Sequence, residues 1–186
     1  MKEYKYPTEQ EWGEIIIRPH LDTSKLNETV AGVLSEIRHE GDAAVRKYEQ
    51  MFDHVVLDSL QVTKEEIDAA VASVDSELLD ALKLAHANIH KFHSSQHISP
   101  KRVTTAPGVE CWQKCVAIEK VGLYIPGGTA PLFSTVLMLA TPARIAGCGE
   151  IVLCTPPDRE GHINPAILAA AHVAGVDKIF KIGGVQ

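Results

Sequence analysis

The sequence predicts an α/β protein in which a helical N-terminal region is followed by part of a parallel sheet. Before about residue 120, apolar residues recur at helical spacing and charged residues are frequent. Beyond it, short apolar runs alternate with helical segments, the pattern of β-α-β units. We therefore divide the 186 residues into a mainly helical region, 1–120, and a β-α-β-α-β region, 121–186.

The composition limits the classes of partner. Hydrophobic residues make up 45% of the chain, enough for a core, and the formal net charge is −6. Nucleic acids and anionic membranes select basic surfaces, so we expect neither as a partner. The first residues form no apolar leader and no apolar run reaches the length of a membrane span, which predicts a cytosolic protein.

The helical region carries recognisable start and stop signals. Asp42, Thr63 and Asp75 are expected to cap three helices, and Glu66 completes a capping box with Thr63. A helix before them is expected to end at Gly41. Its predicted buried face consists of Leu26, Val30, Val33, Leu34 and Ile37.

The end of this region is predicted to be extended. Pro107 and Gly108 form a turn signal between two extended segments, 103–106 and 109–118.

The second region is predicted to contain three parallel strands and two helices. The strands are 121–125, 150–154 and 178–182, and the helices are 132–146 and 164–174. The strands are apolar without alternation, as expected when both faces of a sheet are covered. Pro142 interrupts the first helix, where Thr141 is expected to cap a new turn.

The chain ends directly after the last of these strands. Residues 183–186 read as a Gly-Gly turn that should lead into a helix covering the sheet. We therefore expect the sequence to be a fragment of a longer protein.

The most informative motif is the Pro126-Gly127-Gly128 turn between the first strand and the first helix of the sheet. It is either a tight strand–helix turn or a cradle for a phosphate or dinucleotide. It lacks both the G-x-G-x-x-G fingerprint and the lysine of a P-loop, so we do not expect nucleotide triphosphate hydrolysis. Tyr124, at the end of the strand, either contacts a ligand or fills the core.

Four histidines are spaced by four, three and four residues along one predicted helix: His86, His90, His93 and His97. Such a stripe can bind a metal ion, but no carboxylate or cysteine joins it at a matching spacing. A solvent-facing stripe is the favoured interpretation, and we predict no metal ligands in the chain.

The cysteines and the common catalytic motifs point to no reactive centre. The four cysteines do not have the spacing of a zinc ribbon, and we expect them to be free, mostly buried thiols. They are Cys111, Cys115, Cys148 and Cys154. No paired carboxylates or nucleophile motif is recognisable, so we assign no catalytic residue to the chain.

The segment VGLYIPGGTAPLFSTVLMLATPARIAGCGEIVLCTPP, residues 121–157, closely resembles histidinol dehydrogenases. Weaker resemblance to the same family extends over most of the remaining chain. The segments that carry it are 40–44, 48–53, 88–93, 107–109 and 183–186.

The resemblance implies a specific enzyme, of which this chain would be the N-terminal portion and less than half. Histidinol dehydrogenases are NAD-linked, zinc-dependent homodimers that oxidise L-histidinol to L-histidine through L-histidinaldehyde, the last step of histidine biosynthesis. The resemblance implies a Rossmann-like NAD-binding domain, here incomplete over 121–186, with Tyr124 and Gln186 as NAD contacts. It also implies that the zinc ligands and the acid/base pair lie beyond residue 186. The fragment alone is then expected to be inactive.

A second hypothesis belongs to a different class. An incomplete sheet with an exposed edge invites pairing, so the chain is alternatively a non-catalytic module that associates with itself or a partner.

Overall fold

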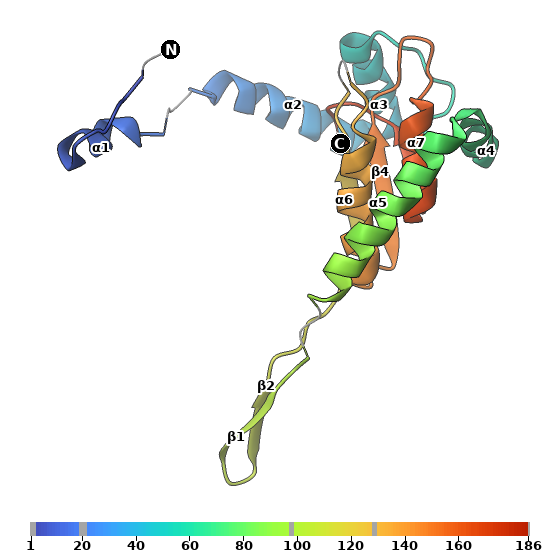
Figure 1. The fold of residues 1–186 in the computed structure, drawn as a ribbon. Helices are drawn as coiled ribbons and strands as arrows, with labels where there is room; N and C mark the ends of the chain where they lie inside the picture. The colour runs from blue at the N-terminus through green and yellow to red at the C-terminus, as the bar shows by residue number, and fades with distance from the viewer. Residues whose placement is uncertain (1–2, 19–21, 97–98, 128–129, 186) are drawn as a thin grey trace.

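The structure, a computed structural model, describes residues 3–18, 22–96, 99–127 and 130–185. A three-stranded sheet with strand order β3-β4-β5 forms its centre, and a two-stranded hairpin, β1-β2, projects away from it (Figure 1). The elements in chain order are α1 (Glu9–Ile15), α2 (Ser24–Glu40), α3 (Asp42–Tyr48), the π-helical turn η1 (Glu49–Asp53), α4 (Lys64–Ser73), α5 (Ser76–Ser94), β1 (Arg102–Ala106), β2 (Val109–Trp112), β3 (Lys120–Tyr124), α6 (Phe133–Ile145), β4 (Glu150–Thr155), α7 (Pro165–Ala174) and β5 (Lys178–Lys181).

The central sheet is parallel, as predicted. Tyr124 pairs with Cys154, and Cys154 in turn pairs with Phe180, so the carboxyl ends of the three strands meet at one edge. The fold is therefore the expected α/β class with a parallel, Rossmann-like β-α-β-α-β unit. The segment before α4 extends the sheet beside β5, because Gln61 forms an antiparallel bridge with Phe180.

Two layers of helices are stacked one upon the other against the sheet. Helices α6 and α7 pack against each other, and α4 and α5 pack on their outer side. Three alanines of α7, Ala169, Ala170 and Ala171, are fully buried, and their small side chains allow this close packing. The division at residue 120 stays a prediction, although α4 and α5 lie directly against α6 and α7.

Two apolar clusters form the core. The larger one lies between the sheet and α4–α7 and includes Ile125, Leu153 and Ile179. The smaller one surrounds Val45 of α3 and includes Val185, which follows β5. The second cluster fixes the helical region against the end of β5.

Two of the predicted helix caps are confirmed. The hydroxyl of Thr63 accepts a hydrogen bond from the N–H of Glu66, whose carboxylate accepts from the N–H of Thr63. Asp75 accepts from the N–H of Glu77 at 2.7 Å. These signals are local in sequence, which is why they can be read from it.

The predictions for Asp42 and Thr141 are wrong. Gly41, at φ 59°, occupies the cap position between α2 and α3, and Asp42 is the first residue of α3. Helix α6 continues through Pro142 without a new start, and the Thr141 hydroxyl caps nothing. Pro142 has no N–H, so α6 continues through it without the hydrogen bond to the carbonyl of Met138.

Three expectations about burial and extension also fail. Leu26, Val30 and Leu34 of α2 are exposed, because nothing in the described chain covers this part of the helix. Strand β3 alternates between exposed and half-buried residues, so one of its faces is open. The second extended segment pairs only as far as Trp112, not to residue 118.

Among the residues that the structure describes, no helix combines the length and the apolar character that a membrane span requires.

Candidate functional site

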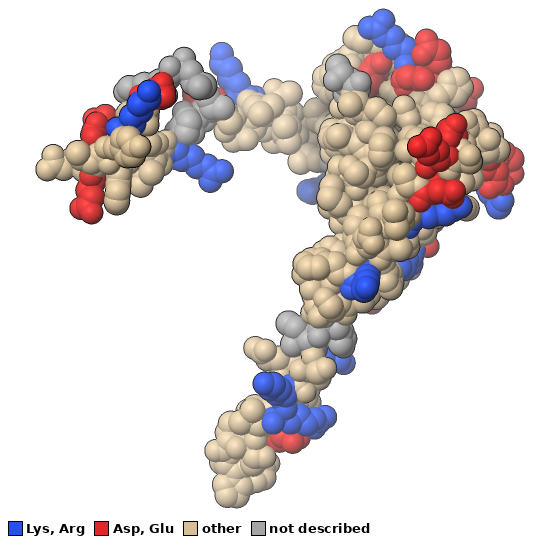
Figure 2. Space-filling view, viewed as in Figure 1, with Lys and Arg blue, Asp and Glu red and all other residues tan. Residues whose placement is uncertain are grey.

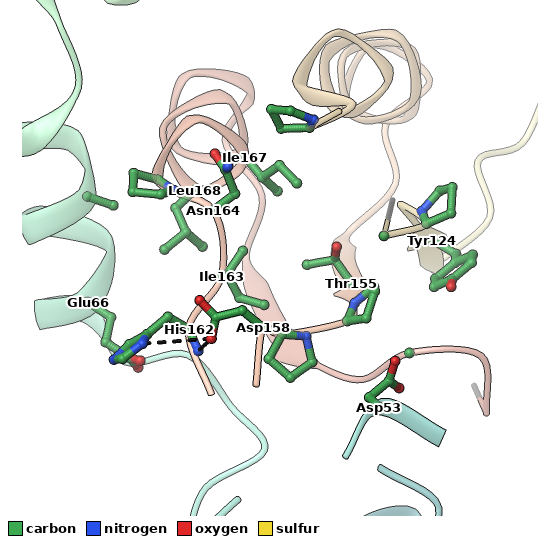
Figure 3. Close-up of a pocket in the computed structure, with 18 of the residues that line it drawn as sticks. Asp53, Glu66, Tyr124, Thr155, Asp158, His162, Ile163, Asn164, Ile167 and Leu168 are labelled. Carbon is green, nitrogen blue, oxygen red and sulfur yellow. Dashed lines mark hydrogen bonds and ion pairs between the residues drawn. The ribbon is translucent and has the colours of Figure 1, made fainter. Parts of the chain in front are cut away.

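A large cleft lies at the carboxyl edge of the parallel sheet. It has a volume of about 1180 Å³. The loops after β3, β4 and β5 form its floor, and residues of η1, α4 and α7 form its walls (Figure 3). Ligands of open α/β sheets bind at this edge, and the volume is sufficient for a dinucleotide.

Two glycines allow the three loops to meet. A β-carbon on Gly127, after β3, would lie 2.7 Å from Cγ of Pro156, after β4. A β-carbon on Gly183, after β5, would lie 2.6 Å from Cβ of the same proline. Both distances are shorter than real side-chain contacts, so only glycine fits at these positions.

Tyr124 lines the cleft from the last position of β3. It is 37% exposed, which contradicts a core role for the ring and agrees with a role at the surface of the cleft. Its neighbour Ile125 is fully buried and donates its N–H to the carbonyl of Cys154, which fixes the backbone at this point. Gln186, the other predicted NAD contact, lies outside the described residues, as do Gly128 and Thr129 of the Pro-Gly-Gly turn.

The opposite wall is built by the loop that precedes α7. Asn164 caps α7 by accepting from the N–H of Ala166 at 2.9 Å. Asp158 accepts from the backbone N–H groups of Glu160 and His162, and its carboxylate lies 3.8 Å from the His162 ring nitrogen. Figure 3 shows Glu66, His162 and Asp158 on this side of the cleft, with Tyr124 and Asp53 on the other.

Carboxylates dominate the charge of the cleft. Asp53, Glu66 and Asp158 all line it, and no lysine or arginine is among its described lining residues. Glu66 is partly neutralised, because Lys181 of β5 donates to its Oε1 at 2.5 Å. A phosphate bound here would depend on backbone N–H groups and solvent rather than on a basic side chain.

A buried acid lies directly behind Asp53. Glu49 is 1% exposed, and its Oε1 accepts from the N–H of Gly183 at 2.9 Å. Burial, opposed by that hydrogen bond and reinforced by Asp53, raises the pKa of Glu49 to about 7. The carboxylates of the cleft were missed in the sequence, since Asp53, Glu66 and Asp158 come together only through the packing of η1, α4 and the loop before α7.

Three of the four histidines of the stripe, His86, His90 and His93, are among the described residues. His86 and His90 have ring centroids 6.1 Å apart, and His93 pairs with Gln96 at 2.7 Å. Within the described ranges, no group of three or more histidine, cysteine or acidic side chains is arranged to hold a metal ion. His97 lies outside the described residues.

The cysteines are free, as expected, but two of the four are exposed and only one is fully buried, so the expectation of mostly buried thiols is wrong. Cys148 is buried and Cys154 half-buried, whereas Cys111 and Cys115 are exposed. Both exposed thiols belong to the chain at and after the projecting strand β2, which has no core to enter.

Comparison with known proteins identifies the family. A profile described as histidinol dehydrogenase matches residues 16–186. The chain is 60% identical over all 186 residues to a histidinol dehydrogenase of Bacteroides thetaiotaomicron, of which it covers 44%. It is 49% identical over 173 residues to the corresponding protein of Salmonella typhimurium, of which it covers 39%.

A solved structure agrees in fold as well as in sequence. The crystal structure of histidinol dehydrogenase from Elizabethkingia anophelis matches 97% of this chain with a TM-score of 0.91 and 47% identity. The chain covers 42% of that protein, so it spans well under half the length of the relatives that it matches. The profile, the identities and the shared fold agree, and the chain belongs to the histidinol dehydrogenase family.

Proposed function

We propose that the chain contributes the first part of an NAD-linked, zinc-dependent histidinol dehydrogenase, which oxidises L-histidinol to L-histidine through L-histidinaldehyde. The observation that supports this proposal most directly is the cleft at the carboxyl edge of β3–β5 in a chain of this family. The role of this chain is then to bind and orient the cofactor.

The cleft is the proposed NAD site. Its size and its close backbone approach at Gly127 and Gly183 fit a dinucleotide. Tyr124 would pack its ring against the bound cofactor, and Gln186 would contact it from the turn after β5. NAD accepts the hydride that the substrate alcohol loses, and the protein residues position it and exclude water.

The described residues do not fit a zinc site. We propose that the zinc ligands and the acid/base pair come from sequence beyond residue 186, one ligand being supplied by a partner subunit. The 186-residue chain should accordingly bind NAD without oxidising L-histidinol.

A homodimer is part of the proposal. Helix α2 exposes Leu26, Val30 and Leu34, and the hairpin exposes Val103 and Trp112. Figure 2 shows uncharged surface along much of α2 and at the tip of the hairpin, with basic and acidic side chains gathered nearer the base of the hairpin. Exposed apolar surface of this extent is typical of an interface.

Titration of NAD into the purified chain tests the cofactor site. Saturable binding that Tyr124→Ala weakens by roughly threefold to tenfold, about the energy of one aromatic contact, supports it. Val56→Ala, which removes an exposed side chain that does not line the cleft, should leave the affinity unchanged. Unchanged affinity in the Tyr124 variant would contradict the assignment, and turnover of L-histidinol by the chain alone would contradict its proposed inactivity.

The alternative function, a non-catalytic assembly module, is favoured by one observation. Strand β3 is an edge strand of the sheet among the described residues, and one of its faces is open. Sedimentation at several concentrations, with and without NAD, separates the two proposals. Concentration-dependent assembly without NAD binding would support the assembly-module proposal and contradict the proposed cofactor site.

A further inference from the structure

Two carboxyl groups of η1 converge on the glycine that follows β5. Glu49 accepts a hydrogen bond from the N–H of Gly183 through Oε1 at 2.9 Å. Asp53, four residues later, reaches the same glycine, because a β-carbon there would lie 2.7 Å from Asp53 Oδ2. The helical region therefore holds the turn after β5 through Glu49, and Asp53 packs closely beside it.

The second oxygen of Glu49 has no partner when both acids are ionised. Its Oε2 is buried and accepts no hydrogen bond from any described residue. Two ionised carboxylates offer no hydrogen to each other, and a buried unpaired charge is costly. A single proton between the two groups gives the buried Oε2 of Glu49 a hydrogen-bond partner and removes one of the two negative charges. The neutral acid then donates to the remaining carboxylate.

We propose that Glu49 and Asp53 share one proton at neutral pH and together position the turn at Gly183. In this arrangement Oε1 of Glu49 holds the Gly183 N–H, and the protonated Oε2 donates to the Asp53 carboxylate. Two neighbouring carboxyl groups in a buried site cannot both ionise easily, so the proton belongs to the pair.

The charges around the pair agree with this arrangement. Burial is the main cause that raises the pKa of Glu49 to about 7, and Asp53 raises it further. Burial also raises the pKa of Asp53, which the hydrogen bond with Glu49 and the charge of His54 oppose. From the sheet, Cys154 faces Glu49, and its own pKa is raised by burial and by the Glu49 charge.

The pair lies where it can affect the proposed cofactor site. Asp53 and Gly183 both line the cleft, and Gly183 also contacts Pro156. As the pH rises through about 7, Glu49 loses the shared proton and two negative charges face each other. The added negative charge beside Asp53, which lines the cleft, should then oppose the binding of an anionic cofactor. This last step rests on the proposed function.

Carboxyl NMR of the ¹³C-labelled chain tests the shared proton without any ligand. We expect one glutamate carboxyl to titrate near pH 7, the Gly183 amide to follow the same midpoint, and the signal to be absent in Glu49→Gln. In Asp53→Asn the amide can donate to an ionised Glu49 and the Asp53 charge is gone, so the midpoint should fall below that of wild type, although burial still raises it. A wild-type midpoint below about 5, or a midpoint unchanged in Asp53→Asn, would overturn the proposal.

Titration with NAD at pH 6 and pH 8 tests the link to the cleft. Wild type should bind roughly fivefold more weakly at pH 8, the lower end of the usual range for coupling between two sites. Glu49→Gln should bind equally at both values, because glutamine keeps both hydrogen bonds and cannot titrate. The exposed Glu65→Gln should behave as wild type. Equal wild-type affinity at both values would overturn the link, whereas absence of binding would contradict the proposed function and leave the carboxyl titration to decide the shared proton.

Discussion

Gly183 lies so close to Pro156 that a β-carbon on the glycine would approach the proline Cβ to 2.6 Å. The contact joins the end of β4 to the end of β5 at the floor of the cleft. After β3, a β-carbon on Gly127 would likewise approach Pro156 Cγ to 2.7 Å. One proline therefore sets the spacing of all three loops.

Alanine at Gly183 should disturb this junction. We expect Gly183→Ala to lower the free energy of unfolding by about 1–3 kcal/mol, the usual cost of overpacking. Gly122→Ala is a matched control, because a β-carbon at Gly122 in β3 would meet no atom within 4 Å. Urea denaturation of both variants measures the difference. Equal stability of the two variants would show that the loops adjust freely.

Thr141 offers a stabilising substitution. It is 1% exposed within the helical layer, and its hydroxyl has no hydrogen-bond partner among the described residues. Thr141→Val replaces the hydroxyl by a methyl group of similar size and should raise the free energy of unfolding by about 1 kcal/mol. The half-buried Thr135 of the same helix provides the control, and Thr135→Val should change little. A destabilised Thr141→Val protein in thermal unfolding would indicate that the hydroxyl has a partner.

Asp177 should stabilise the fold only when it is ionised. Its Oδ2 accepts from the N–H of Ile151 at 2.8 Å and from Arg144 at 2.9 Å, which joins α6 to the start of β4 and β5. Burial raises the pKa of Asp177, but these two hydrogen bonds outweigh it and hold the pKa below its usual range. A lowered pKa means that the contribution is present above about pH 4, the unfolded value, and is lost as the pH falls through the folded value.

Asp177→Asn should therefore be less stable than wild type at pH 7 and approach it in acid. We expect a difference of about 1 kcal/mol at pH 7, since the carboxylate is partly solvent-screened. Urea denaturation between pH 2.5 and 7 measures it, with the exposed Asp58→Asn as the control. A difference that persists at the lowest pH would contradict the role of the charge.

The raised pKa of Glu49 predicts the opposite pH dependence of stability from that of Asp177. Its pKa rises from 4.5 to about 7 on folding, so the folded state binds more protons between these values. Stability should fall as the pH rises from about 4.5 to about 7 and change no further above that. Relative to wild type, Glu49→Gln should gain up to about 3 kcal/mol over this interval, by the linkage between pKa and free energy. A pH-independent difference between the two proteins would contradict the titration of Glu49.

The sequence and the structure agree where signals are local. The Thr63–Glu66 capping box, the Asp75 cap and the Pro107-Gly108 turn each depend on neighbouring residues, and each is confirmed. The order of strands and helices after residue 120 also follows from hydrophobic pattern alone. Tyr124 could be placed at the cleft because the carboxyl ends of parallel strands meet at one edge.

Features that depend on distant packing could not be predicted. Glu49 and Asp53 occupy a π-helical turn, and only contact with Gly183 reveals their relation. The exposed face of α2 looks like a buried helix face in the sequence, because periodicity indicates an apolar face without showing what covers it.

NAD is proposed to bind in the cleft at the carboxyl edge of the sheet. The most direct measurement is an NMR titration of the isotope-labelled chain with NAD, following backbone amides on both sides of the molecule. We predict saturable shifts at Tyr124, Gly127 and Gly183, with β1 and β2 unaffected. The absence of saturable shifts, or shifts confined to residues outside the cleft, would contradict the claim.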